Sequence, residues 1–323
     1  MSGDTGTRVA GWMVVLSLPL VFVGSILAVL PLFSPAAISP LRPTGPELLA
    51  RLAGGGGIAL LGLLLGVVGL ALYVLIPAFS GPDRARRDYG SHRTVLASTL
   101  FSVILGNVVA LLYFVLEGRL LAPGTGSPGF LGMALSPSGI AVAAVSLDIA
   151  LAAVVYLRVV RPGAIGWIRM GLQREKLGSR LLVGLAFGAL LLFTSTALEW
   201  AMESVGIRQT QAELFASVRG ARPVEFLLVL LAGAVIAPVA EEFFFRGFVF
   251  RAYLDQKGTV RAFLYSAALF AAMHFSPPAF PPILAMGLLL AFLYYRTGSI
   301  IPGIVAHSVN NAAAFFLLYL GIS

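Results

Sequence analysis

Residues 226–246 have the sequence FLLVLLAGAVIAPVAEEFFFR. Residues 226–240 carry no charge, and Glu241, Glu242 and Arg246 follow them in the same apolar run. An apolar helix of about 20 residues crosses the ~30 Å hydrocarbon core of a bilayer. A charged side chain at the centre of such a helix costs roughly 2.5–3.5 kcal/mol on insertion scales. The stretch therefore predicts a membrane helix whose charges pair with each other or serve a function.

The composition of the chain indicates that this helix is one of many. Of 323 residues, 59% are hydrophobic and 11% are charged, whereas soluble domains carry about 25% charged residues. Apolar runs long enough to span a bilayer recur, and we predict an all-α, polytopic transmembrane helical bundle of about 8–9 spans. The candidate spans lie near residues 10–33, 53–79, 94–116, 136–157, 181–199, 225–250, 260–276, 282–296 and 302–321.

The net charge of +8 follows from the loops on one side of these spans. With a cytoplasmic N-terminus, most Lys and Arg residues fall in cytoplasmic segments, as the positive-inside rule requires. The basicity thus needs no nucleic-acid partner, and the lipid bilayer is the expected surroundings. The first span is too long for the apolar region of a signal peptide, so we expect a retained helix. The absence of cysteine excludes disulfides and thiolate metal sites.

Two of the three charged residues in the opening stretch are spaced to form an ion pair, and the third, Glu241, is not. Glu242 and Arg246 are four residues apart, so they share a helix face and predict an intrahelical ion pair with a structural role. Glu241 lies about 100° away around the helix and is free to face another element. Pro238 removes one backbone hydrogen bond just upstream, a feature typical of membrane helices that line a cavity.

Two further segments bring polar side chains to the same depth. Glu241 lies 16 residues before Lys257 and His274 lies 16 residues after Gly258. A helical hairpin about that turn therefore places Glu241 and His274 at equal height. In the last span His307 and Asn311 are four apart and share a face, whereas the neighbouring Asn310 points toward another helix.

The predicted constellation is Glu241, His274, His307 and Asn311, and it suits two kinds of hydrolysis. A buried carboxylate beside an imidazole takes a proton from water, while neutral His and Asn side chains donate to a developing oxyanion. Alternatively, Glu241, His274 and His307 resemble the ligands of a hydrolytic Zn²⁺ site, although the chain has no HExxH motif. Asn107 and Asp148 also lie in spans, where hydrogen bonding to a neighbouring helix is the commoner role.

Three motifs carry a family resemblance. EEFFFR (241–246) fits EExxxR, FAAMH (270–274) fits FxxxH, and HSVNN (307–311) fits HxxxN. In order and spacing they resemble the CPBP family of CAAX-processing and bacteriocin-processing intramembrane proteases, the Rce1/Abi group, over residues 225–318. The resemblance implies a Glu241-activated water assisted by His274, an oxyanion held by His307 and Asn311, and a helix braced by Glu242 and Arg246. The family is commonly labelled metalloprotease, so both a glutamate and a metal mechanism stay open.

The resemblance also implies an organisation and a partner. We expect an N-terminal transmembrane region over residues 1–180 and a catalytic transmembrane core over 181–323. We expect a multi-pass protein of the plasma membrane with its site open to the cytoplasm, acting on a peptide or a prenylated protein. Two alternatives are a secondary transporter and a non-catalytic membrane scaffold. The first requires related halves, which the sequence does not show, and the second uses the buried polar groups only as contacts between helices.

Overall fold

The computed structural model describes residues 2–29, 61–62, 64–79, 82–116, 136–173, 175–207 and 215–322. Every regular element within these residues is helical, which confirms the all-α prediction. The chain divides into two compact units, Met1–Ser80 and Gly81–Ser323. The first unit contains α1 (Ser2–Val29) and a helix over Leu64–Phe79 that ends in the 3-10 turn η2 (Ile76–Phe79). The functional boundary expected at residue 180 concerns where the motifs lie, and it stays a prediction.

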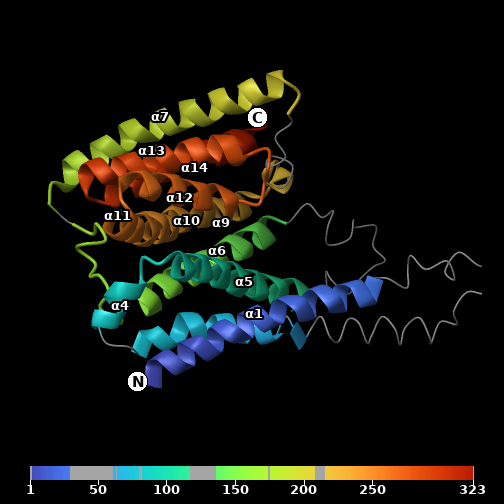
Figure 1. Ribbon diagram of the computed structural model, residues 1–323. Helices are drawn as coiled ribbons and strands as arrows, with labels where there is room; N and C mark the ends of the chain where they lie inside the picture. The colour runs from blue at the N-terminus through green and yellow to red at the C-terminus, as the bar shows by residue number, and fades with distance from the viewer. Residues whose placement is uncertain are drawn as a thin grey trace, which may run out of the picture. The chain divides into compact units, whose positions relative to one another are not determined.

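The second unit contains the helices that hold the motifs (Figure 1). Three of its segments, η3, η5 and η6, are π-helical, with i→i+5 hydrogen bonds in place of i→i+4. The elements are α4 (Pro82–Asp88), α5 (His92–Leu116), α6 (Pro137–Val155), η3 (Tyr156–Val160), α7 (Leu177–Ser204), η4 (Ala216–Val218), α9 (Pro223–Leu231), η5 (Ala232–Ile236), α10 (Ala237–Glu241), η6 (Glu242–Phe250), α11 (Arg251–Lys257), α12 (Thr259–Ala272), α13 (Phe280–Thr297) and α14 (Ile301–Leu320).

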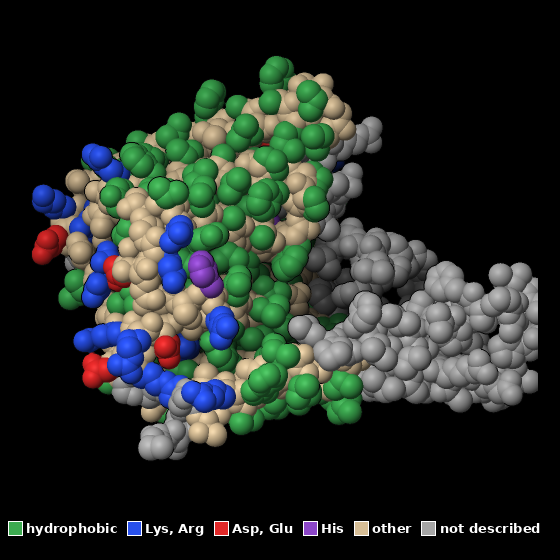
Figure 2. Space-filling view, viewed as in Figure 1, with side chains coloured by type: hydrophobic (Ala, Val, Ile, Leu, Met, Phe, Trp, Pro, Cys, Tyr) green, Lys and Arg blue, Asp and Glu red, His purple; other side chains and the backbone are tan. Residues whose placement is uncertain are grey.

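Six of the described helices are long and apolar enough to cross a membrane. They cover His92–Tyr113, Pro137–Val160, Leu177–Ser204, Pro223–Lys257, Phe280–Thr297 and Ile301–Leu320, and Leu64–Phe79 and Thr259–Ala272 are shorter apolar helices. Each of the nine predicted spans therefore contains a helix, although residues 30–33 and 53–60 of the first two lie outside the described residues. Figure 2 shows apolar side chains over α7, α13 and α14 and Lys and Arg gathered at one end of the helices. The chain is an integral membrane protein with a helical polytopic bundle.

Glycines set the distance between α7 and α14. A Cβ atom on Gly184 would lie 2.6 Å from the Cβ of Val305, and one on Gly188 would lie 2.7 Å from the Cβ of Val309. Small residues spaced by four let two membrane helices approach backbone to backbone. This contact fixes α14, and α14 carries His307.

The predicted hairpin is present. Helix α11 ends at Lys257, Gly258 turns the chain with φ +87°, and α12 begins at Thr259. Helix α12 then packs against η6. Ser266 donates a 2.9 Å hydrogen bond to the Phe245 carbonyl across that contact, which aligns the two arms.

The helix over 223–257 differs from the regular α-helix expected. The π-helical segments η5 and η6 bracket the short α10, so the EExxxR motif begins at an α-to-π junction. The Ala237 N–H bonds to the Ala232 carbonyl, and the next bond in that register would reach Gly233 from Pro238. Proline has no N–H, so the Gly233 carbonyl receives no donor from its own helix in this register.

Candidate active site

The ion pair predicted within η6 is present. Arg246 Nη1 lies 2.8 Å from Glu242 Oε1, and both side chains are 0% exposed. Arg246 Nη2 donates to the Gly287 carbonyl of α13 at 3.2 Å, and its guanidinium lies 4.6 Å from the centre of the Phe270 ring. Arg246 therefore ties η6 to both α12 and α13. The structural role given to this pair stays a prediction.

His307 connects α14 to both glutamates. Its Nε2 lies 3.8 Å from Glu241 Oε2, and its Nδ1 lies 3.5 Å from Glu242 Oε1. The imidazole and Glu242 are fully buried, whereas Glu241 keeps 16% of its side chain exposed. A Cβ on Gly303 would lie 2.6 Å from Glu242 Oε2, so only glycine leaves room for the carboxylate at this point of α14. Glu241 is thus the less buried acid of the pair.

His274 lies just beyond the end of α12. Its Nδ1 is 2.8 Å from the Phe270 carbonyl. A carbonyl can only accept, so Nδ1 carries the proton and the Nε2 of the neutral ring keeps a free lone pair. The Phe270 ring makes edge contacts with His274 and His307 at centroid distances of 5.1 and 5.6 Å.

The histidine in contact with Glu241 is His307. Counting along the hairpin paired Glu241 with His274, but the imidazole within 4 Å of the Glu241 carboxylate belongs to His307. His274 joins the cluster through the ring of Phe270. The reason is that α14 docks closely against η6 at Gly303 and brings its histidine to both carboxylates.

Asn311 donates a hydrogen bond to the Gly233 carbonyl, which Pro238 leaves without a donor from its own helix. Its Nδ2 donates to the Gly233 carbonyl at 2.9 Å, and its Oδ1 accepts from Asn310 at 3.2 Å. Asn310 Oδ1 in turn lies 3.5 Å from the hydroxyl of Ser195 on α7, in agreement with its predicted contact to a neighbouring helix. Asn311 keeps one amide hydrogen for another acceptor.

Asp148 is the site residue that sequence reasoning left aside. It is 3% exposed on α6, a helix that packs against α10. Its Oδ2 has no hydrogen-bond donor among the described residues. Asn107, by contrast, is exposed and donates to the Val103 carbonyl of its own helix. The sequence offered one indication of a role for Asp148, namely that an aspartate lies within an apolar span.

The zinc alternative can be compared with the side-chain positions. Within the described part of the chain, no group of three or more His, Cys, Asp or Glu side chains is spaced to hold a metal ion. Glu241, His274 and His307 therefore do not form a ligand set in this arrangement.

Comparison with known proteins agrees with the motifs. Residues 223–313 match the family described as Type II CAAX prenyl endopeptidase Rce1-like. This segment is similar to the Rce1-like family. It contains the complete helix of the EExxxR motif, His274, His307 and Asn311. The resemblance to CPBP intramembrane proteases is therefore confirmed.

One curated relative extends the comparison beyond this domain. The "Putative membrane peptidase YdiL" of Bacillus subtilis (strain 168) is 27% identical over 142 residues, which are 43% of this chain and 57% of the relative. The chain thus spans little more than half the length of the curated relative it matches. No solved structure matches the chain.

Proposed function

We propose that the protein is an intramembrane endopeptidase in which Glu241 activates water for attack on a peptide bond. The observation that carries the proposal is the contrast between two adjacent glutamates. Glu242 is neutralised by Arg246 at 2.8 Å, whereas Glu241 is partly exposed, and its one ion-pair partner within 4 Å among the described residues is the His307 imidazole. A carboxylate held in an apolar surrounding without a fixed cation is suited to accept a proton.

The reaction balances with the residues of the cluster. Glu241 takes a proton from water as the water oxygen bonds to the carbonyl carbon, and the carbonyl electron pair moves onto oxygen. His307 and the remaining amide hydrogen of Asn311 are the proposed donors to that oxyanion. When the C–N bond breaks, the proton on Glu241 passes to the leaving nitrogen. His274 Nε2 accepts a hydrogen bond from the other O–H of the water and so orients the water for attack.

The substrate and its side of approach belong to the same proposal. The matched family is described by its action on CAAX prenyl proteins, so a C-terminal peptide with or without a prenyl group is the proposed substrate. The basic residues gathered at one end of the helices favour a cytoplasmic location for that end under the positive-inside rule. We accordingly propose a plasma-membrane protein whose site opens to the cytoplasm.

The test uses the purified full-length protein with prenylated and unprenylated peptides, each with and without a chelator. Glu241→Gln is expected to lower the cleavage rate by about 10²–10⁴-fold, the usual contribution of a general base, and His274→Ala is expected to abolish cleavage. Glu199→Gln, an equivalent change on membrane helix α7, is the matched control and should cleave normally. A folded Glu241→Gln protein with full activity would refute the proposal. Loss of activity with the chelator and recovery with added Zn²⁺ would favour the metal route.

A further inference from the structure

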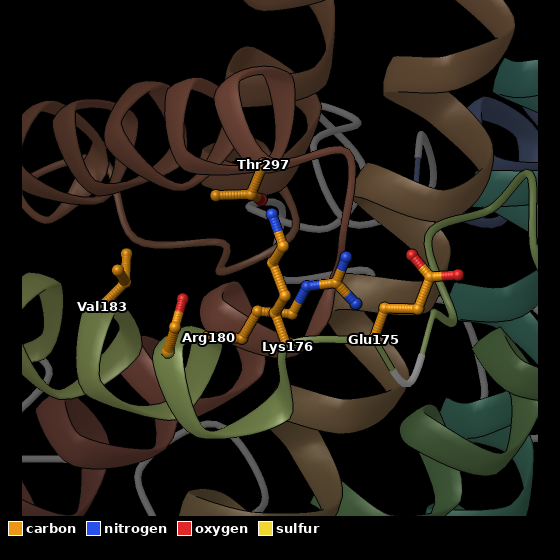
Figure 3. A pocket seen from close by; sticks show the side chains of 6 residues that line it. Glu175, Lys176, Arg180, Val183 and Thr297 are labelled. Carbon is orange, nitrogen blue, oxygen red and sulfur yellow. The ribbon is translucent and has the colours of Figure 1, made fainter.

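A cavity of about 260 Å³ opens where α7 begins. Its lining residues come from the start of α7, the two residues before it and the last residue of α13: Glu175, Lys176, Ser179, Arg180, Val183 and Thr297. Ser179, Arg180 and Val183 share one face at the start of α7 because they are spaced by three and four residues, and Lys176 directly precedes the helix. Figure 3 shows these side chains around one hollow, with Lys176 reaching toward Thr297. The volume is below the roughly 300–1,000 Å³ of most small-molecule pockets, so it suits a compact group.

The chemistry of the lining favours an anion. Two cations, Lys176 and Arg180, face one carboxylate, Glu175, and a serine and a threonine hydroxyl complete the polar wall. Arg180 is held in place because its guanidinium donates to both the backbone carbonyl and the Oε1 of Gln173. Helix α7 also starts without a side-chain cap, so its first N–H groups and the positive end of its dipole add to the attraction.

The surroundings of the cavity identify the source of the anion. Val183 is the apolar side chain of the lining, and seven residues further along the same face of α7 Leu190 is 41% exposed. Helix α7 is a membrane span, so this leucine lies where acyl chains run. A phosphate at the polar mouth and hydrocarbon along the helix below are the two halves of an anionic phospholipid. We propose that this cavity binds the phosphate headgroup of an anionic membrane lipid.

The site has a structural link to α14. The Gly171 carbonyl, in the loop before α7, accepts from Ser299 Oγ at 3.0 Å and from the Ile300 N–H at 3.2 Å. Gly184 then packs on α14 one turn beyond the cavity. A lipid held by α7 and Thr297 therefore stabilises the contact on which α14 depends. This binding does not require peptidase activity.

The test measures binding of dioleoylphosphatidylglycerol to the purified full-length protein by native mass spectrometry in neutral detergent. Lys176→Gln combined with Arg180→Gln is expected to weaken binding by about 10–100-fold, the loss expected for charge-assisted hydrogen bonds. Lys176→Gln alone leaves the Gln173 contacts intact and should weaken binding by about tenfold. The matched control, Arg87→Gln with Arg261→Gln, removes the same charge from exposed positions and should bind as the wild type does.

Three results would overturn the proposal. The first is unchanged affinity in a folded Lys176→Gln protein, and the second is an equal loss in the control, which would indicate diffuse surface attraction. The third comes from a parallel titration with inorganic phosphate. If inorganic phosphate binds as tightly as the lipid, the cavity takes the free ion and the acyl chains contribute nothing. Weak competition by phosphate, together with dioleoylphosphatidylcholine failing to bind, is the expected outcome.

Discussion

Replacing Glu242 by glutamine leaves Arg246 without its ion-pair partner inside the bundle. Both side chains are 0% exposed and their charged atoms lie 2.8 Å apart. Removing one member of a buried ion pair typically costs about 3–5 kcal/mol, because the other charge is left uncompensated. Arg246 keeps its bond to the Gly287 carbonyl and its contact with the Phe270 ring, so we expect a loss of stability near the lower limit, ~3 kcal/mol.

Replacing Arg246 by methionine is expected to cost more. This change removes the ion pair, the hydrogen bond to Gly287 and the contact with Phe270, and it leaves Glu242 charged, so ~4–5 kcal/mol is expected. The double variant, Glu242→Gln with Arg246→Met, contains neither charge. Neutral side chains of similar volume often replace a buried ion pair at little cost. We therefore expect the double variant to be more stable than the Arg246→Met single variant.

The assay is reversible unfolding in mixed micelles by increasing the share of SDS, followed by the fluorescence of the three tryptophans. The four proteins of the cycle give the coupling energy between the two side chains. Arg222 and Glu225 form a comparable pair at 2.7 Å, but Arg222 is 76% exposed. Neutralising that pair is the matched control, and its effect should be much smaller because exposed ion pairs contribute little. Additive losses in the Glu242–Arg246 cycle would refute this account of the pair.

Two more changes test the surroundings of the glutamates. Gly303→Ala places a Cβ 2.6 Å from Glu242 Oε2, so the same assay should show a loss of about 1–3 kcal/mol, whereas Gly166→Ala, where the added Cβ meets nothing within 4 Å, should be near neutral. Wild-type stability of Gly303→Ala would contradict the close approach. Asp148→Asn removes a buried carboxylate whose Oδ2 has no donor among the described residues, so stability should rise by about 1–3 kcal/mol. A fall in stability would instead indicate that the Asp148 carboxylate has a partner.

Local geometry explains which parts of the fold could be predicted from the sequence. Apolar runs located the helices, Gly258 located the hairpin turn, and the spacing of Glu242 and Arg246 gave their ion pair, because each depends on residues close together in the chain. The π-helical segments could not be predicted in this way. A choice between i→i+4 and i→i+5 bonds depends on what packs against the helix, and here α14 and α12 contact that stretch.

In the candidate site, too, residues close together in the chain could be predicted, whereas contacts between distant helices could not. Motif spacing selected His274 and His307, but only the packing of α14 against α10 brings His307 to Glu241. Asp148 could not be assigned to the site because no sequence pattern says that α6 packs against α10. The cavity at the start of α7 likewise depends on Thr297, which lies more than a hundred residues from Lys176 in the chain.

The missing N–H of Pro238 has a consequence for how the helices align. Proline lacks the N–H that would bond the Gly233 carbonyl from within the helix. This carbonyl accepts a hydrogen bond from the Asn311 side chain of α14 instead. Asn310 donates to Asn311 from the other side, so reversing the Asn311 amide would break two hydrogen bonds at once. Sliding α14 by one turn, about 5.4 Å, would separate Asn311 from the Gly233 carbonyl. A proline and an asparagine thus define the axial register in which His307 reaches Glu241.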